Sequence, residues 1–394
     1  MANSLLTPKE ITRKALVILH QKLNFVGNVN RTYDSKFAKE GAKIGNSIDI
    51  RLPNQYVVTD GPNLVTQDTN DQVVTLQINK QKHVGVSFSS VERTLSLDDY
   101  ADRVLEPAMA QLAASIEADA FSMMLDVPYA VNNIGSPLTF RKVLEARKIL
   151  NDNLAPMDNN RSVILNTTDN VDMVDQLKGL FQDSTQIAKQ YREGMMGRTG
   201  GFDFWENTLM PGQVTGTAAA ATGYTVNGAA QTGATIVVAT GTATFKKGDV
   251  ITIGGVNRVH PESKVDTGTL QQFVVTADFA GGAGTINISP SIVATGAYQN
   301  VTASPANGAA IAKLGTASGI YRPSLAFHRD AFAFATVDLI LPPKKDAYRE
   351  VYDGISMRFV SDYNIQNDTL PARFDVLYGY KTIRPQLAVR LLSN

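Results

Sequence analysis

The residues that could do acid–base or metal chemistry in this sequence are few and widely separated. The chain has four histidines, at His20, His83, His260 and His328. None of them shows the spacing of a metal site such as His-Glu-x-x-His. Asp98 and Asp99 are a possible pair of acid–base carboxylates, but they follow Ser96 at the expected start of a helix, where carboxylates favour the helix dipole. The sequence therefore predicts no metal site and no bound cofactor.

Two further motifs lack the surrounding residues that catalysis or phosphate binding would need. His328-Arg329-Asp330 supplies a base and an acid, but the chain has no Gly-x-Ser-x-Gly nucleophile elbow to accompany them. The glycine run from Gly281 to Gly284 does not open a helix, so it is a turn and not a phosphate-binding loop. Cysteine is absent, which excludes disulfides and thiolate chemistry. We predict that the protein is not an enzyme, and a hydrolase using Asp98, Asp99 or His328 stays a weak alternative.

Composition also limits the partners of this 394-residue chain. It carries 37 Lys and Arg against 37 Asp and Glu, so its overall field gives no strong attraction to nucleic acid or to anionic membrane. The longest apolar run near the N-terminus, residues 15–19, is too short for a signal-peptide core. The charge-free stretches are too rich in Gly, Thr and Asn to span a bilayer. We expect a soluble intracellular protein.

The chain opens with a well-signalled helix. Thr7 can cap it, Pro8 suits its first position and Glu10 completes a capping box. An apolar stripe follows at helical spacing, at Ile11, Ala15, Leu16, Leu19 and Leu23. This stripe predicts either a helix packed in the core of its own chain or an arm that docks on a neighbouring subunit.

The pattern then alternates with a period of two. Residues 48–52, 74–78 and 84–88 alternate, and turn residues fill 53–71, which predicts a long hairpin with a wide tip that rests on another surface. Beyond it, Pro107 breaks or kinks a helix whose apolar stripe continues to Val127.

Further elements alternate between helix and strand. Residues 139–153 predict an amphipathic helix, 162–165 a buried strand and 169–181 another helix. The polar residues 182–201 then predict a loop, which is either solvated or a contact at a symmetry axis.

An uncharged block interrupts this mixed pattern. Residues 207–245 and 279–312 contain no Asp, Glu, Lys or Arg. Strand patterns at 235–240, 249–253, 272–276 and 285–288 are separated by glycine turns. The block therefore predicts an inserted all-β domain, and the alternating segments 325–337, 355–363 and 373–391 return to an α+β host.

In this order of elements the sequence resembles the major capsid proteins of tailed double-stranded DNA bacteriophages. The similarity is carried by three segments, namely Glu106-Pro-Ala-Met-Ala-Gln-Leu-Ala-Ala-Ser-Ile-Glu-Ala-Asp119, Gly201-Phe-Asp-Phe-Trp-Glu-Asn207 and Arg373-Phe-Asp-Val-Leu-Tyr-Gly379. The segment Phe245-Lys-Lys-Gly-Asp-Val-Ile-Thr-Ile-Gly-Gly-Val256, followed by residues 272–276, resembles coat proteins of short-tailed phages that carry an immunoglobulin-like β insertion.

The resemblance implies a tailed-phage major capsid fold with an inserted all-β domain. Its domains would be an N-terminal arm (1–45), an extended hairpin loop (46–88), a peripheral domain with a long spine helix (89–135), the first part of an axial domain (136–213), the inserted domain (214–312) and a return to the peripheral and axial domains (313–394). A charged loop that some relatives project from the insertion is missing, because residues 224–240 are short and uncharged.

The resemblance also implies a function. Copies of the chain would associate as hexamers and pentamers into a precursor shell and then an icosahedral virion shell around double-stranded DNA, with weak non-specific DNA contact. Assembly would take place in the host cytoplasm with a scaffolding protein and a portal, and without a membrane. A surface-layer protein or adhesin carrying a β domain is the alternative. The charged candidates for assembly contacts are Arg51, Lys80, Lys82, Lys189, Arg192, Arg198, Arg258, Glu262, Lys264 and Asp266.

Overall fold

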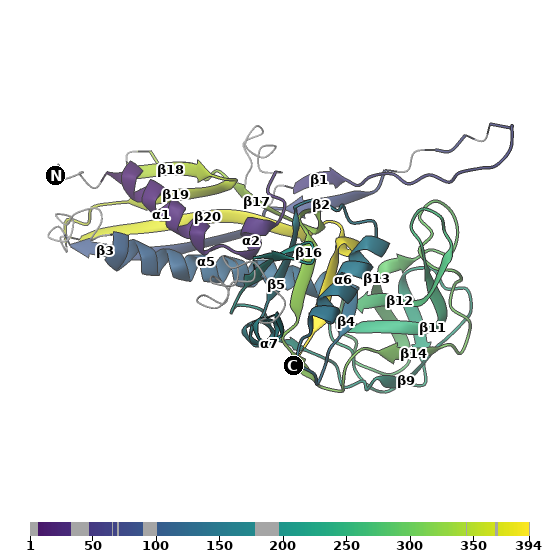
Figure 1. Ribbon diagram of the computed structural model, residues 1–394. Coiled ribbons are helices and arrows are strands. Elements are labelled where there is room, and N and C mark those ends of the chain that lie inside the picture. The colour runs from purple at the N-terminus through teal and green to yellow at the C-terminus, as the bar shows by residue number, and fades with distance from the viewer. Residues whose placement is uncertain are drawn as a thin grey trace. The chain divides into compact units, whose positions relative to one another are not determined.

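The computed structural model describes residues 7–32, 47–64, 66–68, 71–89, 101–177, 197–343, 345–366 and 369–393. Asp98, Asp99, Lys189 and Arg192 lie outside these residues. The chain divides into two compact units (Figure 1), each of which is α+β. Unit 1 combines residues 1–50, 73–121 and 332–383, and unit 2 combines residues 51–72, 122–331 and 384–394.

Unit 1 is built around one long strand, β20 (Thr369–Thr382). β3 (Lys80–Ser89) pairs with residues 369–378 of β20 along one edge. The other edge pairs first with β19 (Ile355–Ser361) and then with β17 (Phe332–Val337). β18 (Asp346–Tyr352) completes the sheet beside β19. β20 alternates weakly and is buried over most of its length, because it has neighbours on both edges and packed residues on both faces.

The predicted hairpin over residues 46–88 is wrong for its last strand, residues 80–88. β1 (Ser47–Arg51) pairs with β2 (Val73–Gln77), as the alternation predicted, and residues 53–72 form the connection. β3 turns away after only two intervening residues and pairs with β20, nearly three hundred positions later in the sequence. Strand alternation fixes which side chains share a face but not which distant strand is the partner.

Helices cover the sheet of unit 1. α1 (Pro8–Lys22) begins as predicted, with the backbone N–H of Glu10 donating to Thr7 Oγ1. Its stripe from Ile11 to Leu23 is buried within its own chain, where α1 packs against β18 and α5. The prediction that this helix packs in the core of its own chain is therefore confirmed for the face that carries the apolar stripe.

The second long helix differs from its prediction at both ends. A π-helical turn, η2 (Ala101–Leu105), precedes α5 (Glu106–Phe121), so the helix changes type one residue before Pro107. The regular helix then ends at Phe121 and continues as a 3₁₀ turn, η3 (Ser122–Asp126), although apolar spacing persists to Val127. Glu117 on α5 is fully buried and accepts the backbone N–H groups of Phe25 and Val26, which open the short helix α2 (Phe25–Asn28).

Unit 2 contains a six-stranded mixed sheet with the order β4-β21-β16-β5-β7-β6. The central strands β5 (Arg161–Leu165), β16 (Ser324–His328) and β21 (Ala388–Leu392) are buried at every position. The flanking strands are β4 (Ala130–Asn132), β7 (Phe202–Glu206) and β6 (Arg198–Thr199). α6 (Phe140–Asp152) packs on β21, β16 and β4, while α7 (Thr167–Leu177) packs on β5. These helices and β5 agree with the sequence prediction.

The uncharged block forms a closed barrel with the strand order β10-β13-β12-β11-β14-β9. Its strands are β9 (Ala221–Val226), β10 (Gly233–Ala239), β11 (Val250–Val259), β12 (Asp266–Val275), β13 (Gly284–Ile292) and β14 (Ala310–Lys313). The strands thus form one closed sheet rather than the two facing sheets of an immunoglobulin-like sandwich. β9 was missed because its sequence, rich in Thr, Ala and Gly, resembles a turn region.

A two-stranded ribbon encloses both ends of the insertion. β8 (Gln213–Val214) pairs with β15 (Ile320–Tyr321), so the chain enters and leaves the barrel side by side. The barrel has its own core, which includes Tyr224, Phe245 and Phe273. Short 3₁₀ turns, η4 (Arg329–Ala331) and η5 (Pro385–Leu387), lie near the ends of β16 and β21. Within the described ranges, no helix is long and apolar enough to cross a membrane.

A fragment of residues 213–321 is expected to fold alone, because it contains all six barrel strands and the ribbon that joins their ends. It should give a dispersed proton NMR spectrum and one cooperative unfolding transition. The shorter fragment 214–312 serves as the control and should be less stable, because it lacks Lys313 and β15. A collapsed spectrum for the longer fragment would contradict an independent core.

Candidate assembly surfaces

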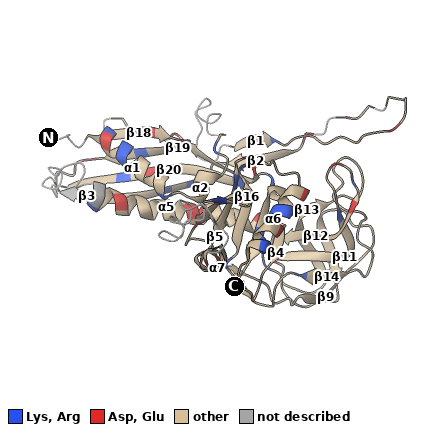
Figure 2. Ribbon diagram, in the orientation of Figure 1, with Lys and Arg blue, Asp and Glu red and all other residues tan. Residues whose placement is uncertain are grey.

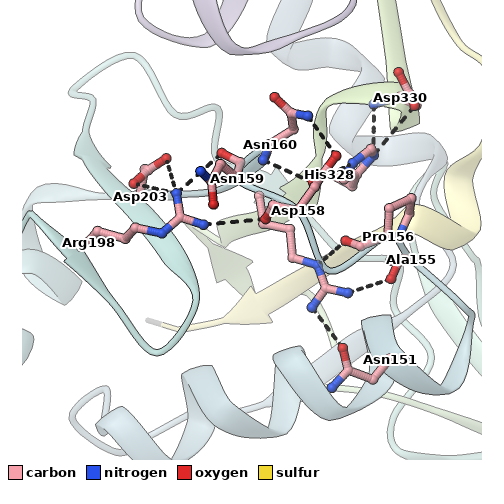
Figure 3. A network of polar contacts seen from close by, with 11 residues as sticks. Asn151, Ala155, Pro156, Asp158, Asn159, Asn160, Arg198, Asp203, His328 and Asp330 are labelled. Carbon is pink, nitrogen blue, oxygen red and sulfur yellow. Dashed lines mark hydrogen bonds and ion pairs between the residues drawn. The ribbon is translucent and has the colours of Figure 1, made fainter.

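The acid–base candidate His328 belongs to a polar network at the end of β16 (Figure 3). His328 Nε2 lies 3.1 Å from Asp158 Oδ1, and His328 Nδ1 accepts the backbone N–H of Asp330. Burial favours a higher pKa for Asp158, but hydrogen bonds from Asn160 and His328 outweigh it and lower this pKa. These contacts tie the loop before β5 to the end of β16.

The same network contains the predicted assembly residue Arg198. Its Nη1 lies 3.1 Å from Asp203 Oδ2 across the β6–β7 hairpin (Figure 3), and it also donates to the Asn159 carbonyl. The neighbouring Arg161 is buried and donates to the Pro156 carbonyl at 2.8 Å and to Asn151 Oδ1 at 2.7 Å. Among the described residues, no group of three or more His, Asp or Glu side chains could hold a metal ion.

Two predicted assembly lysines in unit 1 converge on one carboxylate. Lys80 Nζ lies 3.2 Å and Lys82 Nζ 2.9 Å from Asp119 Oδ2. The Tyr378 hydroxyl donates to the same oxygen at 2.7 Å, and burial together with this carboxylate raises the tyrosine pKa far above its usual value. Burial alone would raise the pKa of Asp119, but the hydrogen bonds from Lys82, Tyr378 and Lys80 lower it. This cluster joins β3, β20 and α5 within one chain.

The predicted assembly residues of the barrel also have partners in their own chain. Arg258 is buried, and its Nη2 lies 3.0 Å from Asp152 Oδ2 on α6. Lys264 Nζ donates to the Ala297 carbonyl at 2.7 Å, and burial lowers its pKa. Asp266 accepts from Asn257 Nδ2 at 3.0 Å. Their charges are thus largely used within the chain.

Arg51 and Glu262 are both exposed predicted residues. The Arg51 side chain is 79% exposed and pairs with Asp71 at 3.3 Å across the base of the extended loop. Glu262 is exposed on the turn after β11. Exposed pairs contribute little free energy, about 0–1 kcal/mol, so Arg51 can exchange its partner at low cost.

The most exposed apolar side chains lie on the connection between β1 and β2. Val58 is 92% and Leu64 is 90% exposed. Gln67 holds the two arms of the connection together, since its Oε1 accepts from the Val57 backbone N–H at 2.9 Å. Val58 and Leu64, on the loop between β1 and β2 (Figure 1), therefore touch little of their own chain.

The junction between the barrel and the mixed sheet was not predicted from the sequence. Arg390, in the middle of β21, is fully buried and donates through Nη1 to Gln213 Oε1 at 2.8 Å and to the Gly248 carbonyl at 2.9 Å. Gln272 of β12 pairs in both directions with the backbone of Ala130 on β4. Charged residues are sparse on the barrel strands (Figure 2), and the one signal for this junction was an arginine inside an otherwise apolar strand.

Comparison with known proteins identifies a family. A family model described as P22 coat protein, gene protein 5, matches residues 27–392. Among solved structures, a Mycobacterium phage Che8 chain is 14% identical with a TM-score of 0.48, over 94% of this chain and 90% of that chain. The CUS-3 coat protein I-domain is 32% identical with a TM-score of 0.19, over 23% of this chain and 95% of that domain. No curated protein sequence is significantly similar.

Asp119→Asn is expected to remove a source of acid sensitivity in unit 1. The lowered pKa of Asp119 means that its contribution is present above the unfolded carboxyl pKa of about 3.9 and is lost as pH falls through the lower folded value. The variant should be about 1–3 kcal/mol less stable at pH 7 and lose less stability below pH ~4 than the parent.

Urea unfolding between neutral and acidic pH measures this difference. Asp60→Asn, in the exposed loop, is the control for loss of one carboxylate and should follow the parent at every pH. If the parent and Asp119→Asn lost stability equally at acidic pH, the three hydrogen bonds would not lower the pKa of Asp119.

Proposed function

Because the chain belongs to the P22 coat protein family and is a major capsid protein, we propose that its copies assemble as hexamers and pentamers into an icosahedral shell enclosing double-stranded DNA. The family match over residues 27–392 is the observation that carries this proposal. The balance of 37 basic and 37 acidic residues suits a shell that holds its genome loosely, since each phosphate contact would add salt-sensitive affinity.

The extended loop is the strongest candidate for an inter-subunit contact. Burying a Val or Leu side chain contributes about 1.5–3 kcal/mol, and Val58 and Leu64 are left almost uncovered within one chain. A neighbouring subunit would supply the missing cover. Because each subunit contacts several neighbours, modest individual contacts sum to a stable shell and still permit correction of wrong associations.

The charged candidates divide according to their partners within the chain. Arg51 and Glu262 are exposed and are proposed as contacts between subunits. Lys80, Lys82 and Arg258 are proposed to act indirectly, by holding their own chain in shape, because breaking a partly buried ion pair leaves a charge uncompensated. Lys189 and Arg192 stay candidates from sequence alone.

The remaining parts of the proposal concern partners and place. A precursor shell would form in the host cytoplasm with a scaffolding protein and a portal at one vertex. The role is structural, without a catalytic step. A surface-layer protein or adhesin is disfavoured by the family match, and it would form sheets or fibres instead of closed particles.

Expression of the full chain, alone and with its scaffolding protein, tests the proposal. Hollow particles of uniform size are expected in gradients and in electron micrographs, because identical subunits with closed symmetry form closed shells. Monomers under both conditions would contradict a capsid role. Sheets or fibres would instead support the surface-layer alternative.

Val58→Glu and Leu64→Glu are each expected to reduce the yield of shells. Loss of about 1.4 kcal/mol at a contact weakens it about tenfold, whereas unfolding of the isolated chain should change by less than about 0.5 kcal/mol because both positions are exposed. Val171→Glu, at a position 68% exposed on α7, adds the same charge elsewhere as a control. Gradient sedimentation and urea unfolding give the two readouts, and unchanged yields would exclude the loop as a contact.

A further inference from the structure

Unit 2 contains a cavity of about 230 Å³ beside the barrel. Its walls come from the barrel strands and turns, the segment before β4, the end of α6, and η5 near the C-terminal strand. Four prolines line it, at Pro128, Pro261, Pro290 and Pro385, together with Tyr129 and Tyr298. Proline and tyrosine have few rotatable bonds, so walls of this composition lose little conformational freedom when a ligand binds.

The charged residues that line this cavity are all basic. No Asp or Glu is among its lining residues, and two arginines, Arg258 and Arg384, are. The guanidinium of Arg258 is already paired with Asp152 at 3.0 Å and lies 5.8 Å from the Tyr129 ring centroid. Six of the lining side chains are Asn or Gln. The lining thus offers mainly neutral hydrogen-bonding groups, beside an Arg258 whose charge Asp152 already compensates.

Two buried atoms on lining residues have unmet hydrogen-bonding capacity. Gln271 Nε2 donates to the Gln272 carbonyl at 2.8 Å and to the Tyr129 hydroxyl at 3.3 Å, while Gln271 Oε1 has no donor. Arg258 Nε has no acceptor. A buried polar group without a partner is unfavourable, so a ligand that satisfies both after a small side-chain movement gains free energy.

We propose that this cavity binds an uncharged amide of about one amino-acid residue, contributed by a neighbouring copy of the chain. An amide offers an acceptor for Arg258 Nε and a donor for Gln271 Oε1. A carboxylate would face the carbonyl of Gln271 without a proton to share, and an ammonium would face two arginines. Ligand pockets usually measure about 300–1,000 Å³, so a cavity of about 230 Å³ is suited to a side chain or a short piece of backbone.

The neighbouring copy as the source rests on the proposed shell, in which amide groups of identical subunits are present at high local concentration. The amide chemistry itself does not depend on assembly, since every lining residue belongs to unit 2 of one chain. The two parts of the proposal are therefore separable by experiment.

Titration of the unassembled full chain tests the chemistry. N-acetylglycinamide should produce saturable NMR shifts at the backbone amides of Tyr129, Gln271 and Tyr298, with a Kd on the order of millimolar, the range of about 4 kcal/mol. Acetate and methylammonium, which carry opposite charges, should leave these signals unchanged. An equal response to all three, or a response to none, would overturn the proposal and leave a water-filled cavity.

Matched variants assign the response to the cavity. Arg258→Lys keeps a charge for Asp152 but lacks Nε, and it should weaken amide binding about tenfold or more, or about 1.4 kcal/mol. Arg198→Lys makes the same change in an ion pair that does not line the cavity, and it should bind as the parent does. If Arg258→Lys fails to fold, Gln271→Met removes the unmet acceptor instead. Unchanged binding in a folded Arg258→Lys or Gln271→Met would contradict the assignment.

The assembled shell distinguishes the source of the amide. In a cryo-EM map of shells, a neighbouring chain's amide should lie within hydrogen-bond distance of Arg258 or Gln271. A cavity that is empty in the shell, in a chain that binds N-acetylglycinamide in solution, would overturn the neighbouring copy as source and leave a free amide as the ligand. Failure of the chain to form shells would contradict the proposed function without altering the titration.

Discussion

The arrangement of unit 2 depends on one buried positive charge. Arg390 stands in the C-terminal strand of the mixed sheet and donates to Gln213 and Gly248 at the base of the barrel. Burial lowers its pKa to about 10, against the opposing influence of Asp249 and Asp126, so the guanidinium is still charged at neutral pH. Only Nη1 of this guanidinium is hydrogen-bonded, while Nε and Nη2 have no partner among the described residues, so the two acceptors at Nη1 are what compensates the buried charge directly. The inserted barrel supplies one of those acceptors, and its position on the sheet is fixed in return.

The connections around the barrel follow the same rule. Asp249 Oδ2 accepts the backbone N–H groups of Gly216 and Lys246, and burial raises the pKa of this carboxyl. Lys313, at the other end of the insertion, donates to the carbonyls of Gly216 and Thr316, and burial lowers its pKa. Asp249 thus binds the entering segment to the barrel, and Lys313 binds the entering segment to the leaving one. The insertion thus interrupts the host sequence, but its first and last residues lie side by side in the structure.

Local signals in the sequence were sufficient for elements whose stability is local. The cap at Thr7, the stripe of α1 and the amphipathic α6 were predictable because capping and helical periodicity involve residues within a few positions of each other. The partner of β3 and the closure of the barrel were not, since both depend on pairing between distant strands. β18 was missed because it is an edge strand with charged residues and little alternation.

The candidate assembly contacts also depend on residues that are distant in the sequence. The sequence predicted Lys80, Lys82 and Arg258 as assembly contacts, but in the structure they pair within the chain with Asp119, Asp119 and Asp152, which lie 39, 37 and 106 positions away. Whether a basic residue is available to another subunit depends on which acidic residues lie close to it in space. The composition of the sequence does not contain that information. The exposed Val58 and Leu64 were marked only as part of a hairpin tip. Solvent exposure, which distinguishes them, appears only when the fold is known.

Closure of the barrel has a consequence for a protein that must associate selectively. Strands such as β10 and β13, rich in Val, Ile and Thr and without charge, would pair readily with copies of themselves if they formed a sheet with open edges. A barrel leaves no edge, because β10 is bonded to both β9 and β13. In unit 1, which has open edges, the edge strand β18 carries Asp346, Arg349 and Glu350. Backbone pairing with another chain is thus discouraged at the barrel and at β18.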